Sequence, residues 1–320
     1  MASRSLVAAV VIIVLLVVGV AAGLYLTKGG VTSTTASSSG SSQSGTVIQV
    51  VAGENFWGSL VSQLGGTHVN VTSIVSDPNT DPHNYESNPS NAEAISNAQL
   101  VIVNGANYDT WATSLISAAN RPGQTVLNVQ EALNQSADAN PHFWYSPYFV
   151  NYTVSAMYKD LIKIDPTDKP YFTTQYASLN ESLWSSYMKQ ETIIKQQFSG
   201  VPVAATEDIF VYMANATGLK VMSPPGFMAA VAEGNDPSAQ DVATFQQLLQ
   251  GGNSTVRVLA YNQQTVTPLT QSMKALAAQN QIPTIGVTET IQPPNYTFQA
   301  WMQGEVAALQ NALNAAALGQ

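Results

Sequence analysis

Residues 171–198 read YFTTQYASLNESLWSSYMKQETIIKQQF, and this stretch decides how the chain is divided. It follows the breaker-rich segment DPTDKP and contains few breakers of its own, so it predicts one long helix. Its apolar side chains recur at the three- to four-residue steps of one helix face, at Tyr176, Leu179, Leu183, Tyr187 and Ile194. A different pattern stands on each side of it, so we expect this helix, within residues 166–199, to link two folded lobes.

Short β-branched runs alternate with helical patterns before the long helix. The runs VIQVVA, VNVTSIV, LVIVN and VLNV cover residues 47–52, 69–75, 100–104 and 126–129. Between them lie FWGSLVSQL, NAEAISNA and TWATSLISAA, whose apolar residues follow helical spacing. Such alternation is typical of βαβ units and a parallel sheet. Residues 46–165 are therefore predicted to form an amino-terminal α/β lobe, which closes with a helix over 147–164.

A second α/β series follows the long helix. VPVAAT (201–206), VRVLAY (256–261) and PTIGVT (283–288) are predicted strands. Helices are predicted near residues 208–217, 238–250, 268–280 and 298–317. Residues 200–320 are thus expected to form a carboxy-terminal lobe. The predicted fold class is α/β: two lobes, each a parallel-sheet α/β sandwich, joined by one long linking helix, with a crevice between the lobes.

The first 45 residues have a composition unlike the rest. LVAAVVIIVLLVVGVAAGLYL, residues 6–26, carries no charge and would span roughly 30 Å as a helix, which is one hydrocarbon core. A cleavable signal peptide has a shorter apolar region, so residues 1–28 predict an uncleaved transmembrane anchor, although cleavage stays an alternative. Residues 29–45 are rich in Ser, Thr and Gly and predict a flexible tether.

Composition limits the compartment and the partners. Asn-x-Ser/Thr sequons begin at seven asparagines and favour an extracytoplasmic domain: Asn70, Asn134, Asn151, Asn180, Asn215, Asn253 and Asn295. The net charge of −9 argues against nucleic acid, because no basic patch is available to neutralise phosphates. The absence of cysteine excludes disulfides, thiolate metal sites, a catalytic thiol and a lipidated cysteine anchor.

Four residues stand at places where a parallel sheet presents ligands. Ligands bind beyond the carboxyl ends of parallel strands, and Glu207 and Glu289 directly follow two of the predicted strands of the second lobe. His83, in DPHNYE, and His142, in NPHFWY, lie in loops after strands of the first lobe, each behind a proline. We expect these side chains, two imidazoles and two carboxylates, to face the same crevice.

Imidazole and carboxylate together suit a divalent ion of intermediate hardness, such as zinc, iron or manganese. Each residue also has an ordinary explanation when taken alone. A histidine in a polar loop is usually solvated, Glu207 beside Asp208 suits a helix amino terminus, and Glu289 suits a cap or the surface. The repeated Pro-His context and the paired acids favour the metal site. His68 has no such support and is expected in a turn.

The same segments resemble a known family. In chain order, DPHNYE with NPSNAEAISNAQLVIVNG, then NPHFWYSP, ATEDIFVYMANATGLKV, EGNDPSAQDV and VTET are similar to the zinc- and manganese-binding solute-binding proteins of ABC importers. The resemblance runs from about residue 47 to residue 315. It implies two α/β lobes joined by a long helix, with one metal ion bound between them and delivered to a membrane permease.

The resemblance also implies the ligands. The histidine of the family's Pro-His-x-Tyr-Glu motif falls on His83 and that of its His-x-Trp motif on His142. The third position, histidine in many zinc members and glutamate in many manganese members, is Glu207. The fourth, usually aspartate, is Glu289, which departs from the pattern by one methylene. Residues 84–141 hold no histidine, as in manganese members, whereas members with similar VTET and EGNDPS segments are commonly zinc binders, so the metal stays open.

The resulting prediction is a membrane-tethered, monomeric receptor that captures Zn²⁺ or Mn²⁺ outside the cell and passes it to an ABC permease. It is not expected to be an enzyme, because four protein ligands leave no open position for a metal-bound water. A metallohydrolase becomes the alternative if only three ligands bind. A cell-surface adhesion protein, with or without the metal, is a further alternative.

Overall fold

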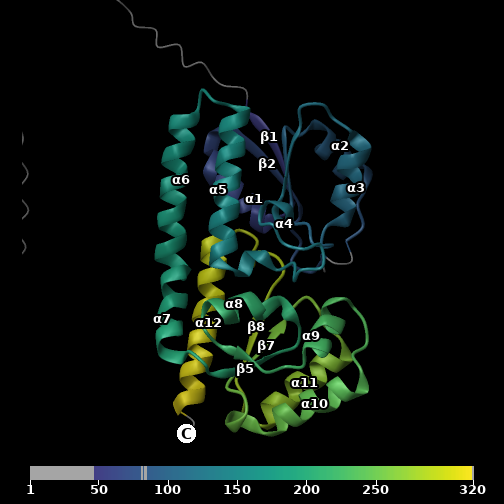
Figure 1. Ribbon diagram of the computed structural model, residues 1–320, viewed down its shortest axis with the longest axis vertical. Helices are drawn as coiled ribbons and strands as arrows, with labels where there is room; N and C mark the ends of the chain where they lie inside the picture. Colours follow the sequence, from purple (N-terminus) through teal and green to yellow (C-terminus); the bar gives the residue numbers. More distant parts are fainter. Residues whose placement is uncertain (1–46, 81, 83–84, 319–320) are drawn as a thin grey trace, which may run out of the picture. The chain divides into compact units, whose positions relative to one another are not determined.

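The computed structural model describes residues 47–80, 82 and 85–318, and these residues contain two parallel sheets. Figure 1 shows the first sheet in the part of the molecule that also holds α1 to α4, and the second in the part that holds α8 to α11. The predicted pair of parallel-sheet α/β lobes is confirmed. The expected anchor at residues 1–28 and the tether at 29–45 lie outside the described residues. Within those described ranges, no helix is long and apolar enough to cross a membrane.

The first sheet has the strand order β2-β1-β3-β4. Its central strand β1 is paired on both sides, since Val50 is in register with Val71 on one neighbour and with Leu100 on the other. β1 and β3 are buried along nearly their whole length, as expected for strands covered by helices on both faces. The elements of this lobe are β1 (Ile48–Glu54), α1 (Asn55–Gly65), β2 (Val69–Val75), α2 (Pro89–Asn97), β3 (Leu100–Val103), α3 (Thr110–Ala119), β4 (Thr125–Asn128) and α4 (Val129–Ala132).

The second sheet repeats this topology with the order β6-β5-β7-β8. In both sheets the first connection leads to one side of the first strand and the next connection leads to its other side. This change lies between β1 and β3 in the first sheet and between β5 and β7 in the second. Such switch points are where α/β folds bind ligands. The elements of this lobe are β5 (Pro202–Ala205), α8 (Val211–Ala216), β6 (Lys220–Val221), α9 (Pro225–Ala232), α10 (Ala239–Gln250), β7 (Leu259–Asn262), α11 (Pro268–Gln279) and β8 (Thr284–Val287).

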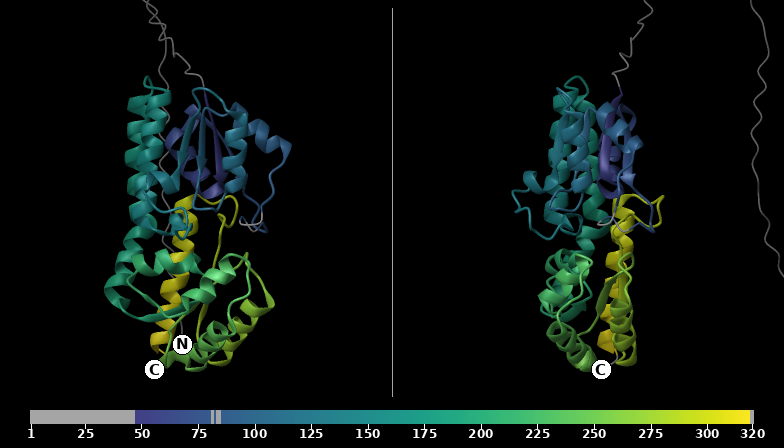
Figure 2. Two further views of the ribbon diagram at one scale, coloured as in Figure 1. Left: turned by 45° about the vertical axis from the view of Figure 1, so that its right-hand side comes forward. Right: turned by 90° about the vertical axis from the view of Figure 1, so that its right-hand side faces the viewer.

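Long helices connect the two sheets. α5 (Pro147–Ile164) has the predicted bounds, with Ser146 capping its first turn by accepting a hydrogen bond from the backbone of Phe149. The predicted long helix is α6 (Lys169–Leu183) and α7 (Lys189–Phe198), joined without a break by the π-helical turn Trp184–Met188. In Figures 1 and 2 this column passes from the level of the first sheet to that of the second. α12 (Phe298–Leu318) packs against α7 and β8.

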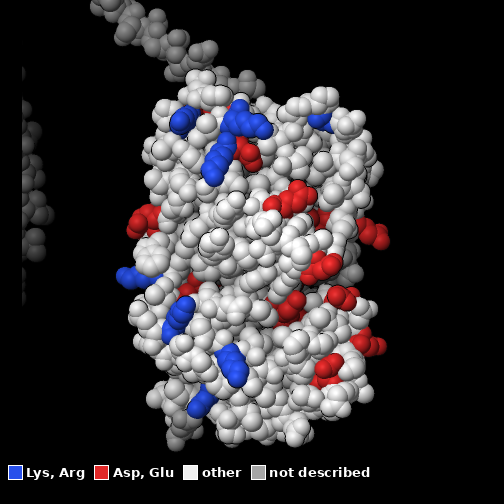
Figure 3. Space-filling view, viewed as in Figure 1, with Lys and Arg blue, Asp and Glu red and all other residues white. Residues whose placement is uncertain are grey.

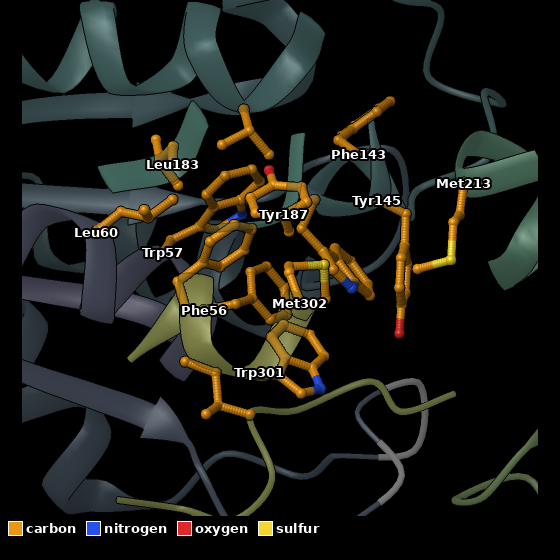
Figure 4. Packing of buried hydrophobic residues seen from close by; sticks show 14 of the residues in the cluster. Phe56, Trp57, Leu60, Phe143, Tyr145, Leu183, Tyr187, Met213, Trp301 and Met302 are labelled. Atoms are coloured by element: carbon orange, nitrogen blue, oxygen red, sulfur yellow. The ribbon is translucent and has the colours of Figure 1, made fainter. Parts of the chain in front are cut away.

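The largest core cluster takes residues from both lobes and from the connecting helices. Phe56 of α1 stacks on Trp144 with ring centroids 4.1 Å apart. Trp301 and Met302 of α12 belong to the same cluster as Phe56 (Figure 4). Leu183 and Tyr187 enter the same cluster from the long helix. Because aromatic rings contribute the largest buried areas of any side chains, this shared packing fixes the positions of the loops that extend from the two sheets.

Two sequence predictions need correction, and two elements were not predicted. The expected strand 256–261 begins three residues later, as β7, and ends one residue later, at Asn262. The expected helix 208–217 is a 3-10 turn, Asp208–Phe210, followed by α8. β6 and α9 were not predicted. β6 has only two residues, and α9 reads PGFMAAVA, which is apolar on most sides and shows no amphipathic period.

Candidate metal site

The carboxyl ends of the two sheets present polar side chains that are buried. β1 ends at Glu54 and β3 is followed by Asn104, while β5 is followed by Thr206 and Glu207 and β7 ends at Asn262. All five side chains are at most 2% exposed. Burying so many polar groups is unfavourable unless they bind one another or a ligand. The switch points of both sheets therefore carry buried polar groups of a kind that is uncommon in a protein core.

His142 is fully buried and is held at both ring nitrogens. Its Nδ1 lies 2.8 Å from Oδ1 of Asn140 and 3.3 Å from Oδ1 of Asp208. The backbone nitrogen of His142 donates to the same Asn140 oxygen at 3.0 Å. Its Nε2 lies 3.3 Å from Oε1 of Glu289, in the other lobe. With acceptors at Nδ1, the neutral ring carries its proton there and presents the Nε2 lone pair, which is the arrangement of a metal-binding histidine.

Glu289 follows β8 and is fully buried. Its Oε1 accepts a hydrogen bond of 2.7 Å from the Asn262 amide, and its Oε2 accepts one of 2.7 Å from the hydroxyl of Tyr108. Both lobes thus orient this carboxylate. The contact between Nε2 of His142 and Oε1 of Glu289 brings these two predicted residues together from opposite lobes.

Glu207 is the third predicted ligand that the structure brings to this place. It continues β5 in extended backbone conformation and is 1% exposed. Burial raises the pKa of Glu207 well above its ordinary value, and the negative charge of Glu289 raises it further, whereas His142 and the side chain of Asn262 lower it. A buried carboxylate in this situation favours a nearby cation.

The charged side chains of the site strongly affect one another's pKa. Burial by itself lowers the pKa of His142, but Glu289 and Asp208 outweigh that effect and raise it to about 10. In the metal-free protein the imidazolium therefore offsets part of the negative charge of Glu289 and Asp208. A divalent cation placed among His142, Glu207 and Glu289 would replace the proton of the imidazole and offset more of the charge.

His83, the remaining predicted ligand, lies outside the described residues. Within residues 47–80, 82 and 85–318, no three His, Asp or Glu side chains stand at mutual distances that already enclose a metal ion. His68 is separate from the site: it lies in a 3-10 turn, as expected of a turn residue, and its Nδ1 contacts Asp168.

A cavity of about 430 Å³ lies beside this place. Its walls come from both lobes and include Tyr108, Asn140 and Asp208, which touch Glu289 or His142, together with Asp138 and Glu233. In Figure 3 acidic side chains gather around the level at which the lobes meet, whereas basic ones lie mainly toward the helical side. The negative walls would raise the local concentration of cations and speed their approach.

Sequence reasoning missed several residues of the site. Tyr108 and Asp109 lie in the loop after β3, at the same sheet edge as His142, so strand-end position was the signal that could have found them. Asp109 accepts backbone hydrogen bonds from Asn104 and Gly105 at 2.6 and 2.9 Å. Burial raises the pKa of Asp109 to about 6, and it raises that of the neighbouring Glu54 well above its ordinary value. Glu54 and Asp109 thus form a buried acid pair next to the site.

A buried network anchors the two loops that carry His142 and Glu289. The Tyr145 hydroxyl lies 2.5 Å from Oε2 of Glu305 and 2.9 Å from the carbonyl oxygen of Thr288, and it donates its one hydrogen to this pair of acceptors. Oε1 of Glu305 accepts from the backbone of Thr288 at 3.1 Å and from the Trp301 indole at 2.9 Å. Tyr145 lies three residues after His142, and Thr288 directly precedes Glu289. One carboxylate of α12 therefore fixes the spacing of both loops.

Comparison with known proteins identifies relatives at low identity. PsaA of Streptococcus pneumoniae, a manganese ABC transporter substrate-binding lipoprotein, is 28% identical over 198 residues, which are 56% of this chain and 62% of that protein. TroA of Treponema pallidum, a zinc-binding protein, is 26% identical over 180 residues, 52% of this chain and 56% of that protein. The chain thus spans less than two thirds of the length of these relatives.

Solved structures show the same fold over a larger share of the chain. A crystal structure of ZnuA matches with a TM-score of 0.65 at 20% identity, covering 83% of this chain and 98% of that one. A manganese-bound periplasmic metal-binding protein from Candidatus Liberibacter asiaticus matches with a TM-score of 0.68 at 18% identity, over 82% and 98%. The family model described as zinc-uptake complex component A, periplasmic, matches residues 50–312. This match covers most of the chain, which therefore belongs to the ZnuA family of metal-uptake substrate-binding proteins.

Proposed function

We propose that this protein is a receptor that binds one Mn²⁺ or Zn²⁺ ion between its lobes and delivers it to an ABC permease. The observation that carries the proposal is the meeting of His142 and Glu289, from opposite lobes, at 3.3 Å in a fully buried place beside Glu207. A divalent cation is a ligand that would offset the charge of these two buried carboxyl groups better than the His142 imidazolium alone.

The ligands in this proposal are His142 through Nε2, the carboxylates of Glu207 and Glu289, and His83 as the fourth. Nitrogen and oxygen donors of this kind suit zinc and manganese. The manganese and zinc relatives PsaA and TroA support the same pair of ions. Carboxylate at two positions shifts the preference toward the harder ion, Mn²⁺, whose uptake we regard as the primary activity. The ion is cargo, so no catalytic role is assigned to any residue.

The setting of the receptor is also part of the proposal. Residues 1–28 anchor it in the membrane, residues 29–45 act as a tether, and residues 46–165, 166–199 and 200–320 form the first lobe, the linking helix and the second lobe of a monomer outside the cytoplasm. The charge-free stretch 6–26 and the relative PsaA, which is a lipoprotein, support this location. Nucleic acid has no role.

Isothermal titration tests the proposal. The metal-stripped full chain is titrated with Mn²⁺ and with Zn²⁺ in the same buffer, and we expect one site per chain. A chain carrying His142→Ala together with Glu207→Ala should lose that site, whereas Asp138→Asn, on the cavity wall, should keep it. Full stoichiometry in the double variant would show that the metal binds elsewhere.

A further inference from the structure

Gln264 lies outside the set of metal ligands, yet its side chain connects the two lobes beside the site. It follows β7 by two residues and is half-buried. Its Oε1 accepts hydrogen bonds from the backbone nitrogens of Glu289 and Thr290, at 2.6 and 3.2 Å. Its Nε2 donates a hydrogen bond of 2.7 Å to the carbonyl oxygen of Thr80, in the loop that follows β2 of the first lobe. One amide thus joins the backbone at Glu289 to the opposite lobe.

The hydrogen-bonding capacity of this amide is matched to its surroundings. An amide offers an acceptor oxygen and a donor nitrogen, and here the oxygen faces two N–H groups while the nitrogen faces a carbonyl. The backbone of Gln264 is also held in place, because its nitrogen donates a hydrogen bond to Oδ1 of Asn262 at 2.9 Å. Asn262 in turn donates to Glu289. A carboxylate or an apolar side chain of the same length could not make this set of contacts.

The loop that Gln264 holds has a second connection to the other lobe. Nε2 of Gln292 donates to the carbonyl of Pro78 at 3.2 Å. Gln292 lies three residues after Glu289. Residue 78 thus contacts the segment that carries Glu289 directly, and residue 80 is connected to it through Gln264. Opening the lobes on this side must break these hydrogen bonds, because they are made across the interface.

We propose that Gln264 is a positioning residue that controls how fast the metal leaves. The hydrogen bonds of its amide to the Glu289 backbone and to Thr80, here called the bridge, keep the Glu289 backbone at a fixed distance from Thr80. The metal therefore dissociates only when the bridge opens. The inference rests on the proposed metal-receptor function and deepens it. Gln264 does not touch the ion in this account, so its loss raises the dissociation rate constant and leaves the association rate constant nearly unchanged.

Stopped-flow kinetics on the full chain separates these rate constants. Mn²⁺-loaded protein is mixed with excess chelator to give the dissociation rate, and metal-free protein is mixed with Mn²⁺ to give the association rate. Gln264→Met keeps the length of the side chain and removes all its hydrogen bonds. We expect dissociation to become about tenfold faster, as loss of two or three hydrogen bonds implies, with association changed by less than about threefold.

Two further variants keep the test decisive. Gln263→Met changes the exposed neighbour of Gln264 in the same way and should leave both rates as in the unmodified chain. Gln264→Glu keeps the acceptor for Glu289 and loses the donor to Thr80, so it should also release the metal faster, although its charge favours binding. It replaces Gln264→Met if that variant fails to fold.

The possible outcomes distinguish this inference from the function on which it rests. If the unmodified chain binds no metal, the proposed function fails and the inference fails with it. If the unmodified chain binds one ion and the dissociation rates of Gln264→Met and Gln264→Glu equal its rate, the function stands and the bridge is refuted. A lower melting temperature of metal-free Gln264→Met with an unchanged dissociation rate would assign Gln264 to fold stability alone and would also refute the proposal.

Discussion

The Tyr108 hydroxyl donates a hydrogen bond of 2.7 Å to Oε2 of Glu289, so a side chain of the first lobe orients a carboxylate of the second. A partner of this kind fixes the direction in which a ligand presents its free oxygen lone pairs, and losing it typically weakens metal binding by 10- to 100-fold. Tyr108→Phe should therefore raise the dissociation constant for Mn²⁺ by about tenfold in isothermal titration. Tyr158→Phe, whose hydroxyl contacts Thr173 between α5 and α6, is the matched control. Equal affinities of the two variants would contradict this role.

Asp208 should support metal binding through His142. Its Oδ1 lies 3.3 Å from Nδ1 of the imidazole, and its negative charge makes the ring a better donor at Nε2. Asp208→Asn should therefore weaken Mn²⁺ binding by about tenfold. Asp138→Asn removes the same charge from the wall of the same cavity without a contact to His142 in the described part of the chain. If both changes weaken binding equally, the effect comes from the general field of the cavity and not from the contact.

Metal binding should release protons. His142 has a pKa of about 10 in the metal-free protein because Glu289 and Asp208 outweigh the effect of burial, so it is protonated at neutral pH. A metal displaces that proton, and affinity therefore rises with pH, by about tenfold per unit for each proton released. Titration in two buffers of different protonation enthalpy should show release of at least about one proton per ion at pH 7. His68→Gln should leave this release unchanged, and identical heats in both buffers would contradict the expectation.

Glu191 gives the fold its own pH dependence, far from the site. It lies on α7 and is 3% exposed, and burial raises its pKa from 4.5 to about 9. The folded state thus binds a proton that the unfolded state has lost. This contribution to stability is fully present below pH 4.5 and disappears as the pH rises to about 9. Within that window the free energy of unfolding should fall by about 1.4 kcal/mol per pH unit because of this one group.

Glu191→Gln should remove that slope, since a neutral amide takes part in no titration. Urea unfolding of metal-free protein at several pH values between 5 and 8 should show the variant becoming progressively more stable relative to the unmodified chain. Glu181→Gln, on the exposed face of α6, should follow the unmodified chain. Parallel curves for Glu191→Gln and the unmodified chain would show that Glu191 is ionised in the folded protein.

The sequence predicted the fold well where local pattern and buried environment agree. The runs at 69–75 and 100–104, and the helix 147–164, follow the observed β2, β3 and α5 closely. The two strands are short and rich in β-branched residues, and the helix has helical spacing of its apolar residues. Local pattern failed at β7, where Val256 and Val258 are buried but precede the strand. It failed at β6 too, because Lys220 and Val221 are strand residues only through their pairing with Pro202 and Val203.

The residues of the candidate site could be predicted from the sequence where they lie just after the carboxyl ends of strands. His142, Glu207 and Glu289 were found in this way, because the carboxyl ends of parallel strands meet at one edge of a sheet. Tyr108 and Gln264 also lie just after strands, but their contacts with Glu289 and Thr80 could not be predicted, since these depend on how the two lobes are packed together. No periodicity within one lobe carries that information.

Anomalous X-ray scattering from crystals of the protein grown with Mn²⁺ tests the central claim most directly. The account predicts a single manganese peak per chain, at bonding distance of roughly 2.0–2.3 Å from Nε2 of His142 and from carboxylate oxygens of Glu207 and Glu289. His83 would complete the same coordination sphere. A peak bound to other residues, or no peak in crystals whose protein binds manganese in solution, would contradict the account.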